Sequence, residues 1–185
     1  MTKISNYFYR KASSLTATIL TVLTFSYLFF VMMKVAKGFE VVGSSTQSLG
    51  TSFGLSAEMI QDFLEMRSVE MIHAYIDFNM IWDNIFALLY GLMYVLWISL
   101  LFKPYSAKAK WLNLLPFVQT IFDWLENFQL VNIANDFLAN VTVSAFNVSL
   151  ASAFVMTKWI ASMLVFTMII VGIVLKIRNR IQNKK

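Results

Sequence analysis

Long apolar segments alternate with shorter polar ones along the whole chain, and this pattern predicts helices that cross a membrane. A helix needs about 20 largely apolar residues to span a hydrocarbon core of ~30 Å. Four segments meet that length: residues 15–36, 80–102, 111–132 and 150–175. We therefore predict an all-α, polytopic membrane protein, a four-transmembrane-helix bundle in which residues 1–185 form a single membrane domain.

Segment 111–132 differs from the other three because polar side chains interrupt it. On a helix these side chains fall within an arc of about 120°; they are Gln119, Thr120, Asp123, Glu126 and Asn127. The alternative is an amphipathic helix lying in the membrane interface, which typically has a broad polar face rich in Lys and Arg. The stripe here is narrow, acidic and free of basic residues, so we favour a spanning helix.

The distribution of basic residues supports four crossings. Most of the 15 Lys and Arg residues lie in three stretches without an acid: Lys3, Arg10 and Lys11; Lys103, Lys108 and Lys110; and Lys176, Arg178, Arg180, Lys184 and Lys185. If all four segments span, these stretches share one side of the membrane. The positive-inside rule makes that side the cytoplasm, so we predict that both termini are cytoplasmic.

A cleaved signal peptide is the alternative interpretation of residues 15–36. The apolar stretch is longer than the 7–15 residues of a typical signal core, and no A-x-A-like cleavage site follows in VMMKVAKGFE. We expect a retained helix.

The opposite side of the membrane then holds residues 37–79 and about 133–149. The first of these begins with a Gly- and Ser-rich stretch that is typical of a loop. Residues 56–77 follow with a helical pattern, for which Ser56 is a suitable N-cap. We expect this amphipathic helix to lie over the outer mouth of the bundle. Asn140 and Asn147 stand in N-x-S/T patterns, which matter only in a eukaryotic secretory setting.

Composition agrees with the membrane interpretation and restricts the chemistry. The chain is 58% hydrophobic and only 14% charged, whereas soluble domains are about 45–50% apolar and about 25% charged. It has no Cys and a single His, His73, so the usual ligands of zinc and haem are missing. We expect no metal and no cofactor, and we interpret His73 as a surface or interfacial residue.

Ionisable residues in three of the predicted spans indicate a polar site. A carboxylate in the hydrocarbon layer costs several kcal/mol unless it is paired or protonated. With a rise of ~1.5 Å per residue, these groups reach overlapping depths in the middle and outer half of the membrane. We predict an intramembrane cluster of Asp83, Tyr90, Asp123, Glu126, Asn127 and Lys158. We expect Lys158 to pair with Glu126 or Asp83, beside a row of small residues at Ser149, Ala153, Thr157 and Ala161 that brings a neighbouring helix close.

A purely structural interpretation of these residues is open as well. Polar side chains between membrane helices stabilise their packing by about 1 kcal/mol each, and Asn127 and Gln119 fit that role. Asp83 could reach the outer water, and Lys158 could extend its amine toward the interface. Asp123 is the residue that fits these alternatives least, because it lies near the middle of its predicted span.

Three local patterns resemble a group of bacterial four-helix membrane proteins. They are D-x2-F-x3-Y at Asp83, Phe86 and Tyr90, LP-x6-D-x2-EN from Leu115 and Pro116 to Asp123, Glu126 and Asn127, and TKW at Thr157, Lys158 and Trp159. The resemblance covers the last three predicted spans. It implies a four-helix membrane fold in the bacterial inner membrane, and it implies no activity.

These observations leave three functional hypotheses. The first is a binding or transport module whose polar pocket holds a lipid, a small amphiphile or a proton. The second is an accessory or structural subunit of a membrane complex, and the third an intramembrane isomerase or hydrolase that works with carboxylates. The chain has no nucleophile elbow, phosphate loop or His-rich box, so the enzyme classes that use them are set aside, and the carboxylate enzyme ranks third among the three hypotheses. The expected partners are membrane lipids, with other membrane subunits or a homo-oligomer as alternatives, and no nucleic acid.

Overall fold

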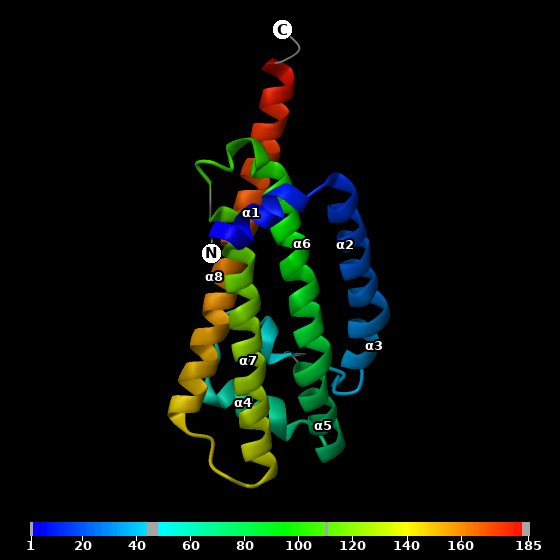
Figure 1. Ribbon diagram of the computed structural model, residues 1–185. Coiled ribbons are helices and arrows are strands. Elements are labelled where there is room, and N and C mark those ends of the chain that lie inside the picture. Colours follow the sequence, from blue (N-terminus) through cyan, green and yellow to red (C-terminus); the bar gives the residue numbers. More distant parts are fainter. Residues whose placement is uncertain (1, 44–47, 110, 183–185) are drawn as a thin grey trace.

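The computed structural model describes residues 2–43, 48–109 and 111–182, and helices account for most of this part of the chain. Four long rods run side by side (Figure 1). The first joins α2, a π-helical turn and α3; the second joins α5, a second π-helical turn and α6; the third and fourth are α7 and α8. Their bounds are Ser14–Tyr27, Leu28–Met32 and Met33–Ala36; Val69–Asp77, Phe78–Asp83 and Asn84–Phe102; Leu115–Leu138; and Ala145–Gln182.

The all-α prediction is confirmed, and among the described residues three helices are long and apolar enough to cross a membrane. They are Ser14–Ala36, Val69–Tyr105 and Ala145–Gln182. The first coincides with the predicted segment 15–36, whereas the other two extend well beyond their predicted ends. Helix α7 forms where a helix was predicted, shifted a few residues toward the C-terminus, but it falls outside the three apolar spans.

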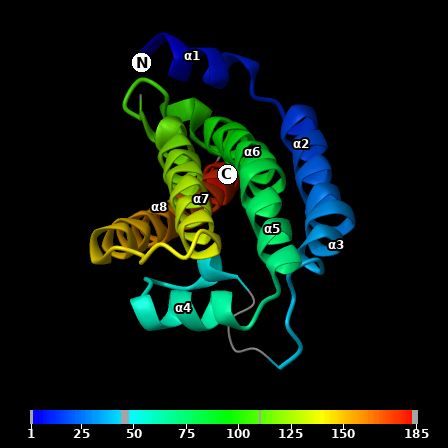
Figure 2. The same ribbon diagram turned by 90° about the horizontal axis from the view of Figure 1, so that it is seen from below.

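The two ends of the bundle differ in their coverings. Helix α1 (Thr2–Lys11) and the last turns of α8 lie at one end, together with the link between α6 and α7 (Figure 1). Near the opposite end α4 (Ala57–Glu65) lies along one side of the bundle (Figure 2). The basic stretches of the sequence therefore gather at the α1 end; Lys110, Lys184 and Lys185 lie outside the described residues.

Helix α1 was not predicted, and a buried asparagine attaches it to the bundle. The Asn113 amide donates to the carbonyl oxygen of Ser5 at 3.0 Å and to Oγ of Ser99 at 2.9 Å, while its Oδ1 accepts from Oγ of Ser5 at 2.7 Å. Tyr9 adds a bond from its hydroxyl to the carbonyl of Ala109; burial raises the pKa of the Tyr9 hydroxyl above its ordinary value. These contacts hold α1 across the end of the rods.

The segment 56–77 forms two helices where one was predicted. Ser56 caps α4 as expected, but the helix ends at Glu65, and Ser68 caps a new helix, α5, which continues into α6. The buried Arg67 fills the corner: its Nε donates to the carbonyl of Phe39 at 2.9 Å and its guanidinium lies 3.5 Å above the Phe63 ring. Burial lowers the pKa of this guanidinium. The corner lets α4 lie across one side of the bundle while α5 runs along it (Figure 2).

The predicted row of small residues on α8 coincides with its packing face only in part. Ser149 and Ala153 are exposed and Ala161 is buried, and the buried positions recur at spacings of three and four: Ala151, Val155, Lys158, Ala161, Ser162 and Val165. Branched side chains contribute to this face as well, since Val165 packs with Ile98 and Leu101 of α6. Lys158 lies within this buried face.

Candidate functional site

Helix α7 has the opposite polarity pattern from a helix on the surface of a soluble protein. Its exposed residues between Leu115 and Val131 are apolar: Val118, Ile121, Leu125 and Phe128. The buried side of the same helix carries the polar stripe: Gln119, Thr120, Asp123, Glu126, Asn127 and Gln129. A helix with an apolar outside and a polar inside suits an apolar surrounding, where ionisable side chains turn toward the bundle interior.

Lys158 on α8 reaches across to two carboxylates on α7. Its Nζ lies 3.0 Å from Oδ1 of Asp123 and 2.5 Å from Oε2 of Glu126. All three side chains are buried, so their charges attract one another more strongly than they would in water. The predicted pairing of Lys158 with Glu126 is confirmed, and Asp123 replaces Asp83 as the second partner.

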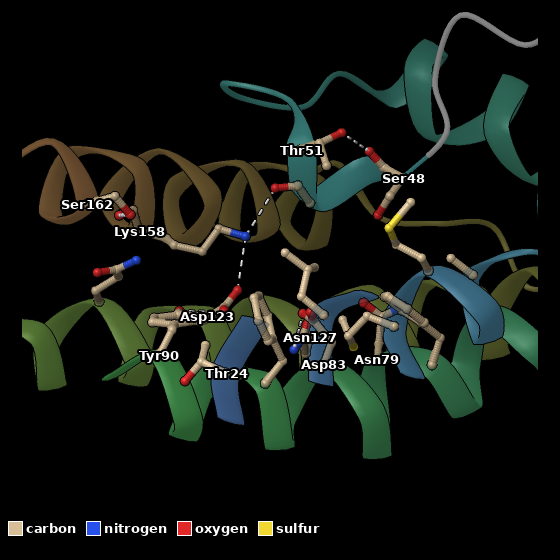
Figure 3. A pocket seen from close by; sticks show the side chains of 18 of the residues that line it. Thr24, Ser48, Thr51, Asn79, Asp83, Tyr90, Asp123, Asn127, Lys158 and Ser162 are labelled. Atoms are coloured by element: carbon tan, nitrogen blue, oxygen red, sulfur yellow. Dashed lines mark hydrogen bonds and ion pairs between the residues drawn. The ribbon is translucent and has the colours of Figure 1, made fainter. Parts of the chain in front are cut away.

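The Lys158 ammonium also donates to the backbone carbonyl of Gly50 at 3.1 Å (Figure 3). Gly50 belongs to a 3-10 turn, Leu49–Thr51, in the loop before α4. A Cβ atom at Gly50 would collide with Oε1 of Glu126, so a larger residue here would require the Glu126 carboxylate to shift. The turn of the loop, and not the helical segment 56–77, covers the ion pairs.

Tyr90, Asp83 and Asn127 connect the same cluster to α6 and the π-helical turn before it. The Tyr90 hydroxyl donates to Oδ2 of Asp123 at 2.6 Å. The Asn127 amide donates to Oδ2 of Asp83 at 2.9 Å and to Oδ1 of Asn84 at 3.1 Å. Thr120 donates to the carbonyl of Ala87 on the same face. The six predicted site residues therefore lie in one connected region, contributed by three rods.

A cavity of about 830 Å³ opens beside this cluster, which is within the usual ligand-pocket range of ~300–1,000 Å³. Most of its lining is apolar and comes from α2, α3, α6 and α8. The polar lining (Figure 3) comes mainly from Thr24, Asn79, Asp83, Tyr90, Gln119, Asp123, Asn127, Lys158 and Ser162, with Ser48 and Thr51 from the loop. Glu126, which pairs with Lys158, is not among the lining residues. Five of the six predicted site residues thus face the cavity.

Both π-helical turns line the cavity at its end nearest α4. Leu28 and Met32 come from the first turn, and Phe78, Asn79 and Asp83 from the second. A π-helical turn inserts an extra residue into an α-helix, shifts its face, and is frequent at functional sites. Here the second turn places Asp83 on the cavity side of its rod, while the Tyr27 hydroxyl bonds the carbonyl of Trp82 across the two rods.

The sequence patterns missed Gly50 and both π-helical turns. Leu49 is the sequence feature that could have predicted the position of this loop. It is an isolated apolar residue in a polar stretch, and it is buried in the core at the α4 end. The π-helical turns have no residue signature that could have been used. Among the described residues no group of three or more His, Cys, Asp or Glu side chains could hold a metal ion.

The geometry suits binding and proton exchange better than metal chemistry. Two carboxylates, one ammonium and one phenol are joined by hydrogen bonds and ion pairs, and Asp83, bonded to Asn127, lines the same cavity. No protein family, no curated protein and no solved structure matches this chain. Any function must therefore be inferred from the residues and geometry of the site.

Proposed function

We propose that this chain is an integral membrane protein whose bundle holds an intramembrane polar pocket, a binding or transport-type module for a lipid, a small amphiphile or a proton. The cavity of about 830 Å³ carries the proposal, because its walls are apolar and its polar side is lined by Asp83, Asp123 and Lys158. Such a site accepts a molecule with one apolar and one polar part.

The proposal includes α7 as a fourth crossing. Its 24 residues extend about 36 Å at ~1.5 Å per residue, which exceeds the ~30 Å hydrocarbon core. The apolar outer face at Val118, Ile121, Leu125 and Phe128 supports exposure to lipid tails. Four crossings place α1 and the end of α8 on one side, which the positive-inside rule assigns to the cytoplasm. The resemblance to bacterial four-helix proteins makes the inner membrane the proposed location.

The accessory-subunit hypothesis is the weaker alternative. It requires a packed interior in which ion pairs only lock the helices together, and protein interiors rarely contain voids much larger than a water molecule. A cavity bordered by Asp83 and Lys158 is the opposite of that expectation. The accessory-subunit hypothesis therefore does not explain why the bundle contains a cavity.

Native mass spectrometry of protein extracted in mild detergent tests the pocket. Ser162→Leu fills the cavity, because this buried side chain lines it. Thr167→Leu is the matched control, since its hydroxyl makes the same bond to the carbonyl four residues earlier but is exposed on α8. We expect wild type and Thr167→Leu to retain a bound amphiphile and Ser162→Leu to lose it. Equal occupancy in all three proteins would refute an amphiphile pocket.

The proton alternative has its own readout. If wild type carries no amphiphile, infrared difference spectra should show a carboxyl band that changes with pH, and single replacement of the cavity-lining carboxylates, Asp83→Asn and Asp123→Asn, should identify the residue responsible. A protein with neither bound amphiphile nor a titrating carboxyl would contradict the proposed function.

A further inference from the structure

Among the residues that line the cavity, the buried side-chain atoms without a hydrogen-bond partner in the described part of the chain are mainly acceptors. The Asn127 amide donates to the Asp83 carboxylate, which fixes which end of the amide carries the oxygen. That oxygen, Oδ1 of Asn127, is fully buried and has no hydrogen-bond partner among the described residues. Oε1 of Gln119, another buried cavity-lining residue, has none within the same part of the chain. A ligand that satisfies these oxygens must bring N–H or O–H groups.

The cationic group of the site is already saturated. An ammonium has three N–H donors, and those of Lys158 meet Asp123, Glu126 and the carbonyl of Gly50. The Tyr90 hydroxyl is committed to Asp123. Lys158 therefore has no hydrogen left for an anionic head group.

The formal charge of the cluster favours a cation. Asp83, Asp123 and Glu126 oppose the single charge of Lys158, which leaves two negative charges if all groups are ionised. At the rim the exposed Lys37 and Glu40 offset one another. An excess of carboxylates in an apolar surrounding requires protons or a bound cation. The Asp83 carboxylate is the one at the cavity wall without a cationic protein partner among the described ion pairs.

The cavity also has an apolar exit between two rods. Phe25 on α2 is 48% exposed and Phe166 on α8 is 49% exposed, and both line the cavity. Their half-exposed rings form a rim that faces the same surroundings as the lipid-facing side chains of these helices. An alkyl chain can leave the cavity between α2 and α8 without meeting a polar group at this rim.

We propose that the pocket binds an amphiphile with a protonated primary amine, whose N–H groups meet the Asp83 carboxylate and Oδ1 of Asn127 while its chain passes between Phe25 and Phe166. This inference rests on the proposed function and specifies the ligand class. The indole N–H of Trp159, buried without a partner in the described structure, lines the same cavity. It suits a hydrogen-bond acceptor next to the amine, such as an ester, hydroxyl or phosphate oxygen.

Titrations followed by native mass spectrometry in phosphatidylcholine nanodiscs test the amine. The probes are dodecylammonium, dodecyltrimethylammonium, dodecanoate and dodecanol, which share a chain and differ in head-group charge and donors. Because hydrogen bonds to charged groups are worth about 1.5–3 kcal/mol, we expect dodecylammonium to bind one to one and at least about tenfold more tightly than the others. Equal binding of the trimethylammonium probe, which has no N–H, would overturn the proposal.

Two carboxylate variants separate the site from general attraction of cations to the protein. Asp83→Asn removes the charge but keeps an acceptor for the Asn127 amide, so the fold should persist; it should abolish the preference for dodecylammonium. Asp136→Asn removes the same charge from α7 at a position outside the cavity and should leave the preference intact. If both variants behave alike, the amine does not bind at Asp83 and the inference fails.

The Ser162→Leu variant distinguishes failure of the pocket from failure of the amine assignment. If it blocks all four probes and wild type shows no preference among them, the pocket stands and the amine assignment falls. If wild type binds no probe one to one, the amine assignment falls, and the proposed function then stands only if a co-purified amphiphile or the pH-dependent carboxyl band is found. Once wild type shows the preference for dodecylammonium, phosphatidylethanolamine is added to the nanodisc. Competition by this lipid identifies a lipid head group as the source of the amine, and lack of competition identifies a single-chain amine.

Discussion

Lys158 of α8 lies 3.0 Å from the Asp123 carboxylate of α7, and both side chains are buried. These two helices follow one another in the chain and pack antiparallel, so the ion pair closes the hairpin that they form (Figure 1). Because Glu126 shares the same ammonium, a single cation balances two acids. The stability of the hairpin and the electrostatics of the cavity therefore depend on the same nitrogen atom.

Lys158→Met should destabilise the protein strongly, because it leaves both carboxylates without their cation. Removal of one partner from a buried ion pair typically costs about 3–5 kcal/mol. We expect a lower melting temperature in detergent and a stronger infrared band of protonated carboxyl groups. Lys34→Met, an exposed position on α3, is the control. An unchanged melting temperature and spectrum for Lys158→Met would show that the pairing contributes nothing.

Tyr90→Phe isolates one hydrogen bond of the cluster. The lost hydroxyl donates to Asp123 at 2.6 Å, and a hydrogen bond to a buried charge contributes about 1.5–3 kcal/mol. Tyr94→Phe is matched closely, since Tyr94 lies one turn further along α6 and lines the same cavity. Thermal unfolding should separate the two variants, with Tyr90→Phe the less stable. Equal losses would mean that ring packing, and not the bond to Asp123, determines the effect.

The spans and the polar stripe were predictable because both depend on local periodicity. Ser14–Ala36 matches its predicted bounds, and the residues from Gln119 to Asn127 are buried together as one face of α7. The contacts of Lys158 were only partly predictable. Depth along a helix follows from residue number, but the rotation that selects Asp123 over Asp83 depends on a π-helical turn and on core packing, which no local pattern reports.

Contacts between segments far apart in the chain were not predictable for the same reason. Gly50 reaches Lys158, and Ser5 reaches Asn113, through backbone positions that only the assembled bundle defines. A glycine in a polar loop and an asparagine before a helix are both common for purely local reasons. The fold class could therefore be predicted from the sequence, whereas the contact of the Gly50 loop with the ion pairs could not.

Gly50→Ala should weaken the ion pairs from the loop side. The added methyl group collides with Oε1 of Glu126, so the turn or the carboxylate must shift, and overpacking of this kind costs about 1–3 kcal/mol. We expect a lower melting temperature and faster amide hydrogen exchange in Leu49–Thr51. Glu126→Asp shortens the carboxylate and makes room, so the double variant should be more stable than the sum of the single losses predicts. If the two losses of stability simply add, the destabilisation by Gly50→Ala comes from the loop backbone and not from the collision with Glu126.

Asn113→Leu should release α1 while leaving the rods folded. The buried amide makes three hydrogen bonds, two to Ser5 and one to Ser99, and its loss removes all three of these links between α1 and the bundle. Hydrogen exchange should increase in Thr2–Lys11 and stay unchanged in α7 beyond its first turns. Asn179→Leu, which removes a bond to the Tyr105 hydroxyl at the same end, should leave α1 protected. Protection of α1 in Asn113→Leu would show that Tyr9 and apolar packing suffice to hold it.

The number of crossings can be tested directly because the chain contains no cysteine. Single cysteines at Lys108, between α6 and α7, and at Val141, between α7 and α8, flank α7 on its two sides; Val141 is exposed. If α7 spans, a membrane-impermeant maleimide should label Val141→Cys in intact cells and Lys108→Cys only after permeabilisation. Labelling of both from one side would mean that α7 does not cross. The polar stripe would then face an aqueous route and not a membrane-buried pocket, so this measurement decides whether the buried carboxylates require an intramembrane explanation.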